Sequence, residues 1–368
     1  MTVRDIGGII ESWAPKEVAW EDDNVGLQCG DGSQKVTSIL VALDPTEKTV
    51  KEAENKSVQM LVTHHPLLFH PLRRIDCQTP AGRMLQHLLQ SRIALYAAHT
   101  NLDASPLGTN DALAEILGLT DTEVLFPQQR TMRKIVTFVP PSDVDAVADR
   151  LAQAGAGNIG KYERCSFRAE GTGTFMGGKE THPVVGLPEQ FERIPEIRLE
   201  MIVPQWRLAV VVAALRRVHP YEEPAYDIYP LENLSAQYGM GMVGNLPRPV
   251  SLAAFLKVLK RQLRIPALRH SPDTGRKVSR VAACGGSGGS LLEEAIRTGA
   301  DVFVTADVKY HSFHEALGRI VVIDAGHFET EHPVVATLAT RLRQEFDRRK
   351  ERIAVRTASS PVNPVRYV

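Results

Sequence analysis

The feature that most constrains the fold is a strand–helix–strand pattern that occurs twice, far apart in the chain. The first copy covers residues 39–65, ILVALDPTEKTVKEAENKSVQMLVTHH, and the second covers residues 280–307, RVAACGGSGGSLLEEAIRTGADVFVTAD. In each copy an apolar run precedes a turn and a stretch with helical apolar spacing, and a second apolar run ends in Val-Thr and polar residues. Alternating strands and helices need crossover connections, so the pattern predicts a largely parallel sheet.

Each copy continues with a helix and a strand that ends in a histidine. The first continuation ends AAHTNLD and contains His99 and Asp103, and the second ends DAGHFETE and contains His327 and Glu331. Both have the form His-x-x-x-acid. We therefore infer two related α/β halves that face each other in one discontinuous domain, formed by residues 1–130 and 233–368.

The segment between the halves has a different pattern. Residues 131–232 read strand, helix, strand and again strand, helix, strand, which is typical of a ferredoxin-like α+β module. A glycine-rich stretch, EGTGTFMGG at 170–178, is predicted to be the loop between its two parts. The length of 368 residues exceeds the size at which a single core usually divides, which agrees with an inserted second domain.

Composition excludes several classes of protein. Lys plus Arg and Asp plus Glu both number 43, without the basic excess that is usual for a nucleic-acid-binding surface. The four cysteines form no CxxC pair, which argues against a disulfide framework or a cysteine zinc site. No apolar run has membrane-spanning length, and the first residues lack the apolar region of a signal peptide. We expect a cytoplasmic protein without membrane or nucleic-acid partners.

Polar side chains stand at the ends of the predicted strands in both halves. In open α/β sheets, ligands bind beyond the carboxyl ends of the strands, so these side chains are expected to meet at one site. Imidazole and carboxylate ligands suit Zn²⁺, Mn²⁺ or Fe²⁺, and five of them, including a carboxylate that can bridge, suit two ions. The five expected ligands are His64, His65, Asp103, His327 and Glu331.

Two glycine-containing segments leave alternatives open. GGSGGS, at 285–290, follows a strand and precedes a helix, so it is either a phosphate-binding loop or a tight turn. It lacks the lysine and the spacing of a P-loop. DDNVGLQCG, at 22–30, is by itself only a loop.

Taken together, five segments resemble a known family, the dinuclear-metal-centre hexamers, also called NGG-interacting-factor-three-like proteins and often labelled GTP cyclohydrolase 1 type 2 homologs. The matching segments are DDNVGLQCG, LVTHHPLLF, AAHTNLD, VTADVKYH and DAGHFETE, in this order. The insert, with GAGNIGKYERCSF and HPYEEPAYDIYPL, resembles the CutA/PII-like module of the longer bacterial members.

The resemblance implies two divalent metal ions per chain. It implies that His65 and Asp103 hold one ion, that His64 and His327 hold the other, and that Glu331 bridges them. His99 matches a family histidine beside the centre and is the candidate for proton transfer, substrate contact or an extra ligand. The resemblance further implies a toroidal homohexamer whose openings are capped by the insert.

Two functions remain open at this point. The first is a metal-dependent hydrolase that acts on a nucleotide-like or phosphorylated small molecule, with GTP ring opening as its specific form. The second is a ligand sensor, in which the PII-like insert binds a small molecule and the metal-loaded domain is a scaffold without multiple turnover.

Overall fold

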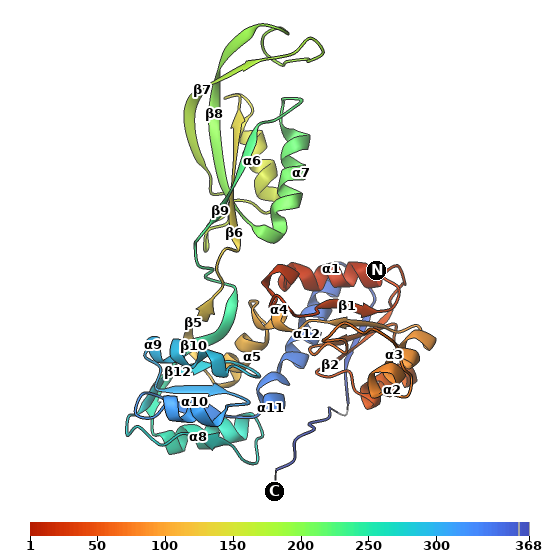
Figure 1. Cartoon of the computed structure of the whole chain (residues 1–368), viewed down its shortest axis with the longest axis vertical. Coiled ribbons are helices and arrows are strands. Elements are labelled where there is room, and N and C mark those ends of the chain that lie inside the picture. The colour runs from red at the N-terminus through yellow and green to blue at the C-terminus, as the bar shows by residue number, and fades with distance from the viewer. Residues whose placement is uncertain (360, 368) are drawn as a thin grey trace. The chain divides into compact units, whose positions relative to one another are not determined.

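The computed structural model describes residues 1–359 and 361–367, and the chain forms two compact units. Residues 1–127 and 237–368 form the discontinuous unit, and residues 128–236 form the inserted unit. The bounds lie within a few residues of those expected from the change in pattern along the sequence. In Figure 1 the inserted unit is coloured yellow to green, and the two parts of the discontinuous unit are coloured red to orange and teal to blue.

The N-terminal half of the discontinuous unit contains a five-stranded sheet. Its strands lie in the order β1 (Gly26–Cys29), β4 (Ala94–Ala97), β3 (Met60–Thr63), β2 (Ser38–Ala42) and β15 (Ala354–Thr357). The four strands from β4 to β15 are parallel, and β1 is antiparallel to β4. Every residue of β3 and β4 is buried because helices cover both faces of the sheet.

The C-terminal half has a six-stranded sheet with a corresponding order. Its strands are β11 (Arg269–His270), β14 (Val321–Asp324), β13 (Val302–Thr305), β12 (Val278–Ala283), β10 (Gly239–Val250) and β5 (Thr120–Pro127). Strands β12, β13 and β14 are parallel, and the edge strand β11 is antiparallel to β14, as β1 is to β4. The central strands of the two sheets thus have the same sequence order and the same directions.

Helices cover both faces of each sheet. The helices of the discontinuous unit are α1 (Val3–Trp13), α2 (Glu47–Asn55), α3 (Pro80–Gln90), α4 (Thr100–Asp103), α5 (Thr109–Ile116), α8 (Leu252–Gln262), α9 (Leu292–Arg297), α10 (Tyr310–Glu315), α11 (His327–Glu331) and α12 (Val334–Arg348), with short 3₁₀ turns at Lys16–Val18 and Gly289–Leu291. Several begin at a side-chain cap: Thr2 and Asp5 form a capping box on α1, and Thr46 and Thr79 cap α2 and α3.

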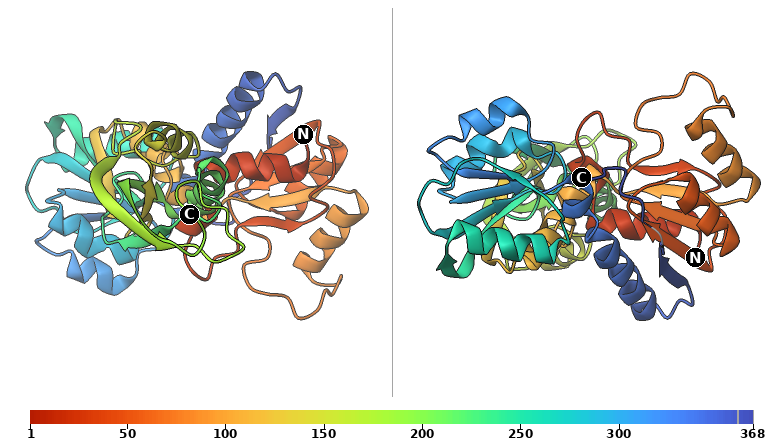
Figure 2. Two further views of the ribbon diagram at one scale, coloured as in Figure 1. Left: turned by 90° about the horizontal axis from the view of Figure 1, so that it is seen from above. Right: turned by 90° about the horizontal axis from the view of Figure 1, so that it is seen from below.

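The two halves exchange elements, which joins them into one unit. Helix α12 and strand β15, from the end of the chain, pack with α1 on the N-terminal sheet, while α2 and α3 cover its other face. In return, α5 and β5, from the end of the first half, join α8 and the C-terminal sheet, whose other face is covered by α9 and α10. Figure 2 shows the dark-blue helix α12 beside the red helix α1.

The inserted unit has the strand order of a ferredoxin-like module. Its elements along the chain are β6 (Met132–Val139), α6 (Val144–Gln153), β7 (Phe167–Met176), β8 (Phe191–Pro204), a 3₁₀ turn (Gln205–Arg207), α7 (Leu208–Val218) and β9 (Tyr226–Leu231). The four strands are antiparallel in the order β7-β8-β6-β9. Both helices pack on one face of this sheet, around Val147, Leu151, Val211 and Leu215.

Two local expectations were wrong. The stretch at 170–178 is not a loop: most of it lies in β7, which forms a continuous antiparallel ladder with β8 from Phe167 to Met176. Likewise, residues 26–29 of the expected loop at 22–30 form β1, because an edge position beside β4 satisfies their backbone groups. Glycine and polar residues had hidden the strand pattern in both places. Strand β10, with three glycines in its first eight residues and two prolines after them, carries no clear strand signal either.

The helices contain no membrane-spanning candidate. Within residues 1–359 and 361–367, none is both long enough and apolar enough to cross a bilayer.

Candidate metal centre

The six side chains singled out from the sequence lie beyond the carboxyl ends of parallel strands. His64 and His65 follow β3, and His99 follows β4 and caps the short helix α4, which ends at Asp103. His327 and Glu331 are the first and last residues of α11, which follows β14. We call these six residues the histidine–carboxylate cluster. The His-x-x-x-acid segments of both halves therefore form equivalent short helices at equivalent strand ends.

Glu331 lies at the centre of this cluster. Its Oε2 is 2.9 Å from Nε2 of His65 and 3.1 Å from Nε2 of His327. Its Oε1 is 3.8 Å from Nε2 of His64, and that nitrogen is also 3.5 Å from Oδ1 of Asp103. The two carboxylate oxygens thus face two different groups of side chains.

The distances between side chains divide the cluster into two contact groups, while the assignment of ligands to the two ions stays a prediction of the resemblance. His65 and His327 share Glu331 Oε2, and their ligand atoms together with that carboxylate lie within 4.8 Å of one another. His64 is nearer to Asp103 than to any other carboxylate of the cluster. His99 also belongs to the group, because its ring centroid is 5.2 Å from that of His64 and 5.4 Å from that of His65.

Each of the four imidazoles is held through its Nδ1 atom. The partners are the Ala98 carbonyl for His64 at 2.9 Å, Asp44 for His65 at 2.7 Å, Asp23 for His99 at 2.9 Å and Asp307 for His327 at 2.6 Å. A carbonyl oxygen can only accept, so Nδ1 of His64 donates and Nε2 carries the lone pair. Histidines that bind metals typically have this arrangement, with one ring nitrogen anchored to oxygen and the other directed at the ion.

Three buried polar atoms of the cluster lack a hydrogen-bond partner within the described parts of the chain. They are Nε2 of His64, Oδ1 of Asp103 and Oε2 of Glu331. His64 is fully buried and Asp103 is 7% exposed. Unpaired polar atoms in the interior cost free energy, so their persistence next to each other fits a site that is built to receive a cation.

The electrostatic balance of the cluster points the same way. Burial lowers the pKa of His65, but the carboxylates of Asp44 and Glu331 outweigh it and raise that pKa to about 10. The hydrogen bond to Glu331 raises the pKa of His327 to about 9. For Glu331, burial acts to raise the pKa, yet the imidazoles of His327, His64 and His65 hold it well below its usual range. The Glu331 carboxylate therefore stays ionised and draws positive charge into the cluster, whereas burial raises the pKa of Asp103.

A glycine makes room for the central carboxylate. A Cβ atom at Gly286 would lie 2.1 Å from Oε1 of Glu331, and the φ angle of 62° at this position is itself unfavourable for other residues. Gly286 is the second residue of the GGSGGS segment. The segment thus contributes space for the Glu331 carboxylate.

The phosphate-binding alternative for this segment is wrong. The backbone N–H groups of Gly285, Gly286 and Gly288 donate to side chains of the protein, namely Asn110 Oδ1, Thr330 Oγ1 and Thr305 Oγ1. An anion would have to displace these bonds. The segment is a tight turn that leads into the short helix α9, which was the other alternative predicted from the sequence.

The anchoring carboxylates are the residues that sequence reasoning missed. Asp44 follows β2, Asp307 follows β13, and Asp23 lies three residues before β1 in the segment at 22–30. Asp307 is the last residue of the second strand–helix–strand copy, but nothing in the sequence assigned it to His327. Its left-handed φ of 53° is tolerated by aspartate better than by most residues.

Comparisons with known proteins agree with this architecture. Residues 1–364 match the model of the family described as Duf34/NIF3 (NGG1p interacting factor 3). A Listeria innocua protein named GTP cyclohydrolase 1 type 2 homolog is 40% identical over 322 residues, which cover 87% of this chain and 86% of that protein. A Staphylococcus aureus protein of the same name is 32% identical over the full length of both chains.

A solved structure is similar over the whole chain as well. The Bacillus cereus protein described as related to NIF3 superimposes with a TM-score of 0.90 at 37% identity, covering 100% of this chain and 99% of that one. The family match and these full-length similarities place the chain in the Duf34/NIF3 family.

Proposed function

We propose that the protein is a dinuclear metal-dependent hydrolase that acts on a nucleotide-like substrate, with GTP ring opening as its specific form. The observation that carries the proposal is the convergence of three anchored imidazoles, those of His64, His65 and His327, on the buried Glu331, with the anchored His99 beside them. The name of similar proteins, GTP cyclohydrolase 1 type 2 homolog, supports a nucleotide-like substrate.

The proposed ligand assignment is the one that the resemblance implied. His65 and Asp103 would hold one ion, His64 and His327 would hold the other, and Glu331, which lies within reach of all three imidazoles, would be shared by both. Imidazole and carboxylate donors suit Zn²⁺, Mn²⁺ or Fe²⁺. Two such ions supply Lewis-acid polarisation of the bond under attack and lower the pKa of a water molecule.

His99 is the proposed catalytic residue. Its Nδ1 faces both oxygens of Asp23, at 2.9 and 3.0 Å, so its Nε2 remains available on the side of the cluster. Burial raises the pKa of Asp23, but bonds from His99 and Thr100 outweigh this and lower it to about 2. Asp23 orients the ring through Nδ1, so Nε2 is the atom at which His99 would take up a proton and return it to a leaving group.

An aromatic side chain beside His99 offers a contact for a base. The ring of Phe69 is 46% exposed, and its centroid is 6.2 Å from that of His99. Hydrogen bonds hold both backbone groups of the preceding residue, Leu68. The Asn24 side chain donates to the Leu68 carbonyl, and the Leu68 N–H donates to the Gln28 side chain. We propose that Phe69 stacks on the base of the substrate, which would give the segment at 22–30 its role.

The proposal includes the assembly and the identity of the insert. The strand order of the inserted unit supports the CutA/PII-like assignment that the sequence resemblance implied. The same resemblance implies a homohexamer, whose mass in solution would be six times the 40.6 kDa of one chain. Light scattering of the purified protein checks this directly.

The experiment that tests the function is formate release from GTP by protein reconstituted separately with Zn²⁺, Mn²⁺ and Fe²⁺. We expect metal-dependent release that is lost in Glu331→Ala and retained in Glu115→Ala, which removes an exposed carboxylate elsewhere in the same unit. No release with any metal, from protein that contains two ions per chain, would exclude the cyclohydrolase and leave phosphoester hydrolysis as the reaction to test.

A second candidate function is a ligand-sensing scaffold without multiple turnover. The observation that favours it is the large pocket in the inserted unit, which is built entirely from residues of that unit. Saturable binding of a small molecule without any product formed over many equivalents of substrate would favour this function over the hydrolase.

A further inference from the structure

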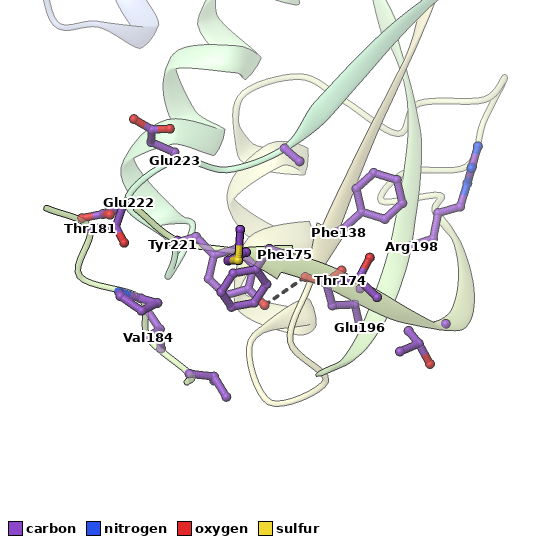
Figure 3. A pocket seen from close by; sticks show the side chains of 18 of the residues that line it. Phe138, Thr174, Phe175, Thr181, Val184, Glu196, Arg198, Tyr221, Glu222 and Glu223 are labelled. Atoms are coloured by element: carbon purple, nitrogen blue, oxygen red, sulfur yellow. Dashed lines mark hydrogen bonds between the residues drawn. The ribbon is translucent and has the colours of Figure 1, made fainter. Parts of the chain in front are cut away.

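The inserted unit contains a pocket of about 670 Å³, within the range of small-molecule sites. It lies over β7 and β8 and is bordered by the segments at 177–185 and 221–225. Figure 3 shows Phe175 and Tyr221 in the middle, Glu222 and Glu223 towards one end, and Phe138 and Arg198 towards the other. Neither the histidine–carboxylate cluster nor its anchors contribute to this pocket.

Glycines in β7 create the space. Gly171 and Gly173 both line the pocket and lie in regular strand pairing with Glu196 and Ile194. A Cβ atom at Gly171 would meet a single atom, 3.9 Å away, so the space above this residue is open. The aromatic rings of Phe138, Phe175 and Tyr221 supply apolar walls that can stack on a flat ligand.

The charges that line the pocket are mainly negative. Glu170, Glu196, Glu222 and Glu223 contribute carboxylates, whereas the one guanidinium among the described lining residues, that of Arg198, donates through Nε to Glu200 at 2.8 Å. The Tyr221 hydroxyl donates to Glu196 at 2.9 Å and fixes that carboxylate beside the aromatic walls. Burial and the neighbouring Glu196 raise the pKa of Tyr221, so its hydroxyl stays protonated as a donor.

We propose that this pocket binds an organic cation, an amine or guanidinium compound with an aromatic or apolar body. The body would lie against the aromatic walls and the glycine surface of β7, and the charged group would face the carboxylates. The same charges disfavour a nucleotide, because its phosphates would face four carboxylates and a guanidinium that is already paired. The proposal is independent of the hydrolase activity proposed for the other unit.

Dansylcadaverine, a fluorescent amine, is a suitable probe, and dansylamide is its matched neutral control. We expect saturable binding of dansylcadaverine to the full-length protein at one site per chain, weakening with rising ionic strength. Dansylamide should bind at least about tenfold more weakly, since it keeps the fluorophore and lacks the charge. GTP should not compete.

Three variants locate the site. The double change Glu196→Gln with Glu223→Gln should weaken dansylcadaverine binding about tenfold or more, whereas Glu163→Gln, which removes an exposed carboxylate outside the pocket, should leave it unchanged. Gly171→Phe should abolish binding by filling the pocket, and its melting temperature shows whether it remains folded. Equal binding of dansylamide, displacement by GTP, unchanged binding in the double variant, or no saturable binding at all would each overturn the proposal.

Discussion

The histidine–carboxylate cluster and the pocket of the inserted unit both concentrate carboxylates, but they use them in different ways. In the cluster, Glu331 is within 3.1 Å of two imidazole nitrogens, and every imidazole is oriented by a further oxygen. In the pocket, the carboxylates border about 670 Å³ of space between aromatic rings. Dense anchoring with little space suits a metal ion, and loose lining with much space suits an organic molecule.

The two sites also differ in which elements of the fold hold their side chains in place. The cluster is assembled from strand ends of both halves, so its geometry depends on the exchange of α5 with α12 and of β5 with β15. The pocket is formed by neighbouring strands and their connections within a single module. Substitutions in the cluster are therefore expected to lower the metal content of the protein. Substitutions in the pocket are expected to leave the metal content unchanged.

The largest expected effect is that of Glu331→Ala. This change removes the carboxylate that faces both groups of imidazoles, so we expect loss of both metal ions and of any metal-dependent turnover. Metal content per chain, measured by mass spectrometry after gel filtration, checks it against Glu115→Ala. Full metal content in the Glu331 variant would break the distinction between the two carboxylate sites.

The second prediction separates the anchors from one another. Asp44→Asn and Asp307→Asn should each weaken metal binding about 10- to 100-fold, because they release His65 and His327. Asp23→Asn should instead lower turnover at unchanged metal content, because it acts through His99. Metal titration and steady-state kinetics on the same preparations test this, and a loss of metal in the Asp23 variant would make His99 a ligand.

The third prediction concerns Gly286. Gly286→Ala places a methyl group 2.1 Å from the Glu331 carboxylate at a left-handed φ, so we expect about 1–3 kcal/mol lower stability and reduced metal affinity. Gly289→Ala is the matched control, because its Cβ would meet no atom within 4 Å. Urea unfolding and metal titration provide the two measurements. Equal effects of both substitutions would contradict the role given to Gly286.

The smallest expected effect is a pH dependence in the inserted unit. Burial lowers the pKa of His219, against the weaker opposing charges of Glu196 and Asp143. The neutral ring fits its contacts: Nε2 donates to the Phe138 carbonyl and Nδ1 accepts from Tyr221 N–H. Its stabilising contribution is therefore present above the unfolded pKa of about 6.5 and is lost as the pH falls below that value.

Amide hydrogen exchange at Tyr221 between pH 7.5 and pH 5 checks this, after correction for intrinsic exchange rates. Exchange should become faster at acid pH in the wild type, and His219→Asn should remove the pH-dependent part. Because Tyr221 borders the pocket, binding of dansylcadaverine should weaken in the same interval. A flat profile in the wild type would show that His219 is not coupled to the pocket.

Much of the candidate site was accessible from the sequence because parallel strands bring their ends together. Once residues 39–65 and 280–307 are recognised as equivalent, His64 and His65 must share a sheet edge with His99, and His327 must occupy the matching edge. The pairing of ligands stays a prediction of the family resemblance. Asp44 and Asp23 were missed because their contacts with histidines join segments 21 and 76 residues apart.

The pocket was hidden by the composition of β7. Its glycines resembled a loop, yet their strand conformation is maintained by the ladder to β8, and the missing side chains leave the cavity. A residue type that weakens a strand signal in the sequence can thus be the one that creates a binding surface in the fold. Strand β10 shows the same limit, since only pairing with β5 and β12 makes it a strand.

The central claim is that the cluster holds two metal ions bridged by Glu331. Titration of metal-stripped protein with Mn²⁺, followed by electron paramagnetic resonance, tests it most directly, because ions about 3.5–4 Å apart are magnetically coupled. The account predicts two bound Mn²⁺ per chain with an exchange-coupled spectrum that disappears in Glu331→Ala. A single uncoupled Mn²⁺ per chain, or a coupled spectrum that survives the loss of Glu331, would contradict it.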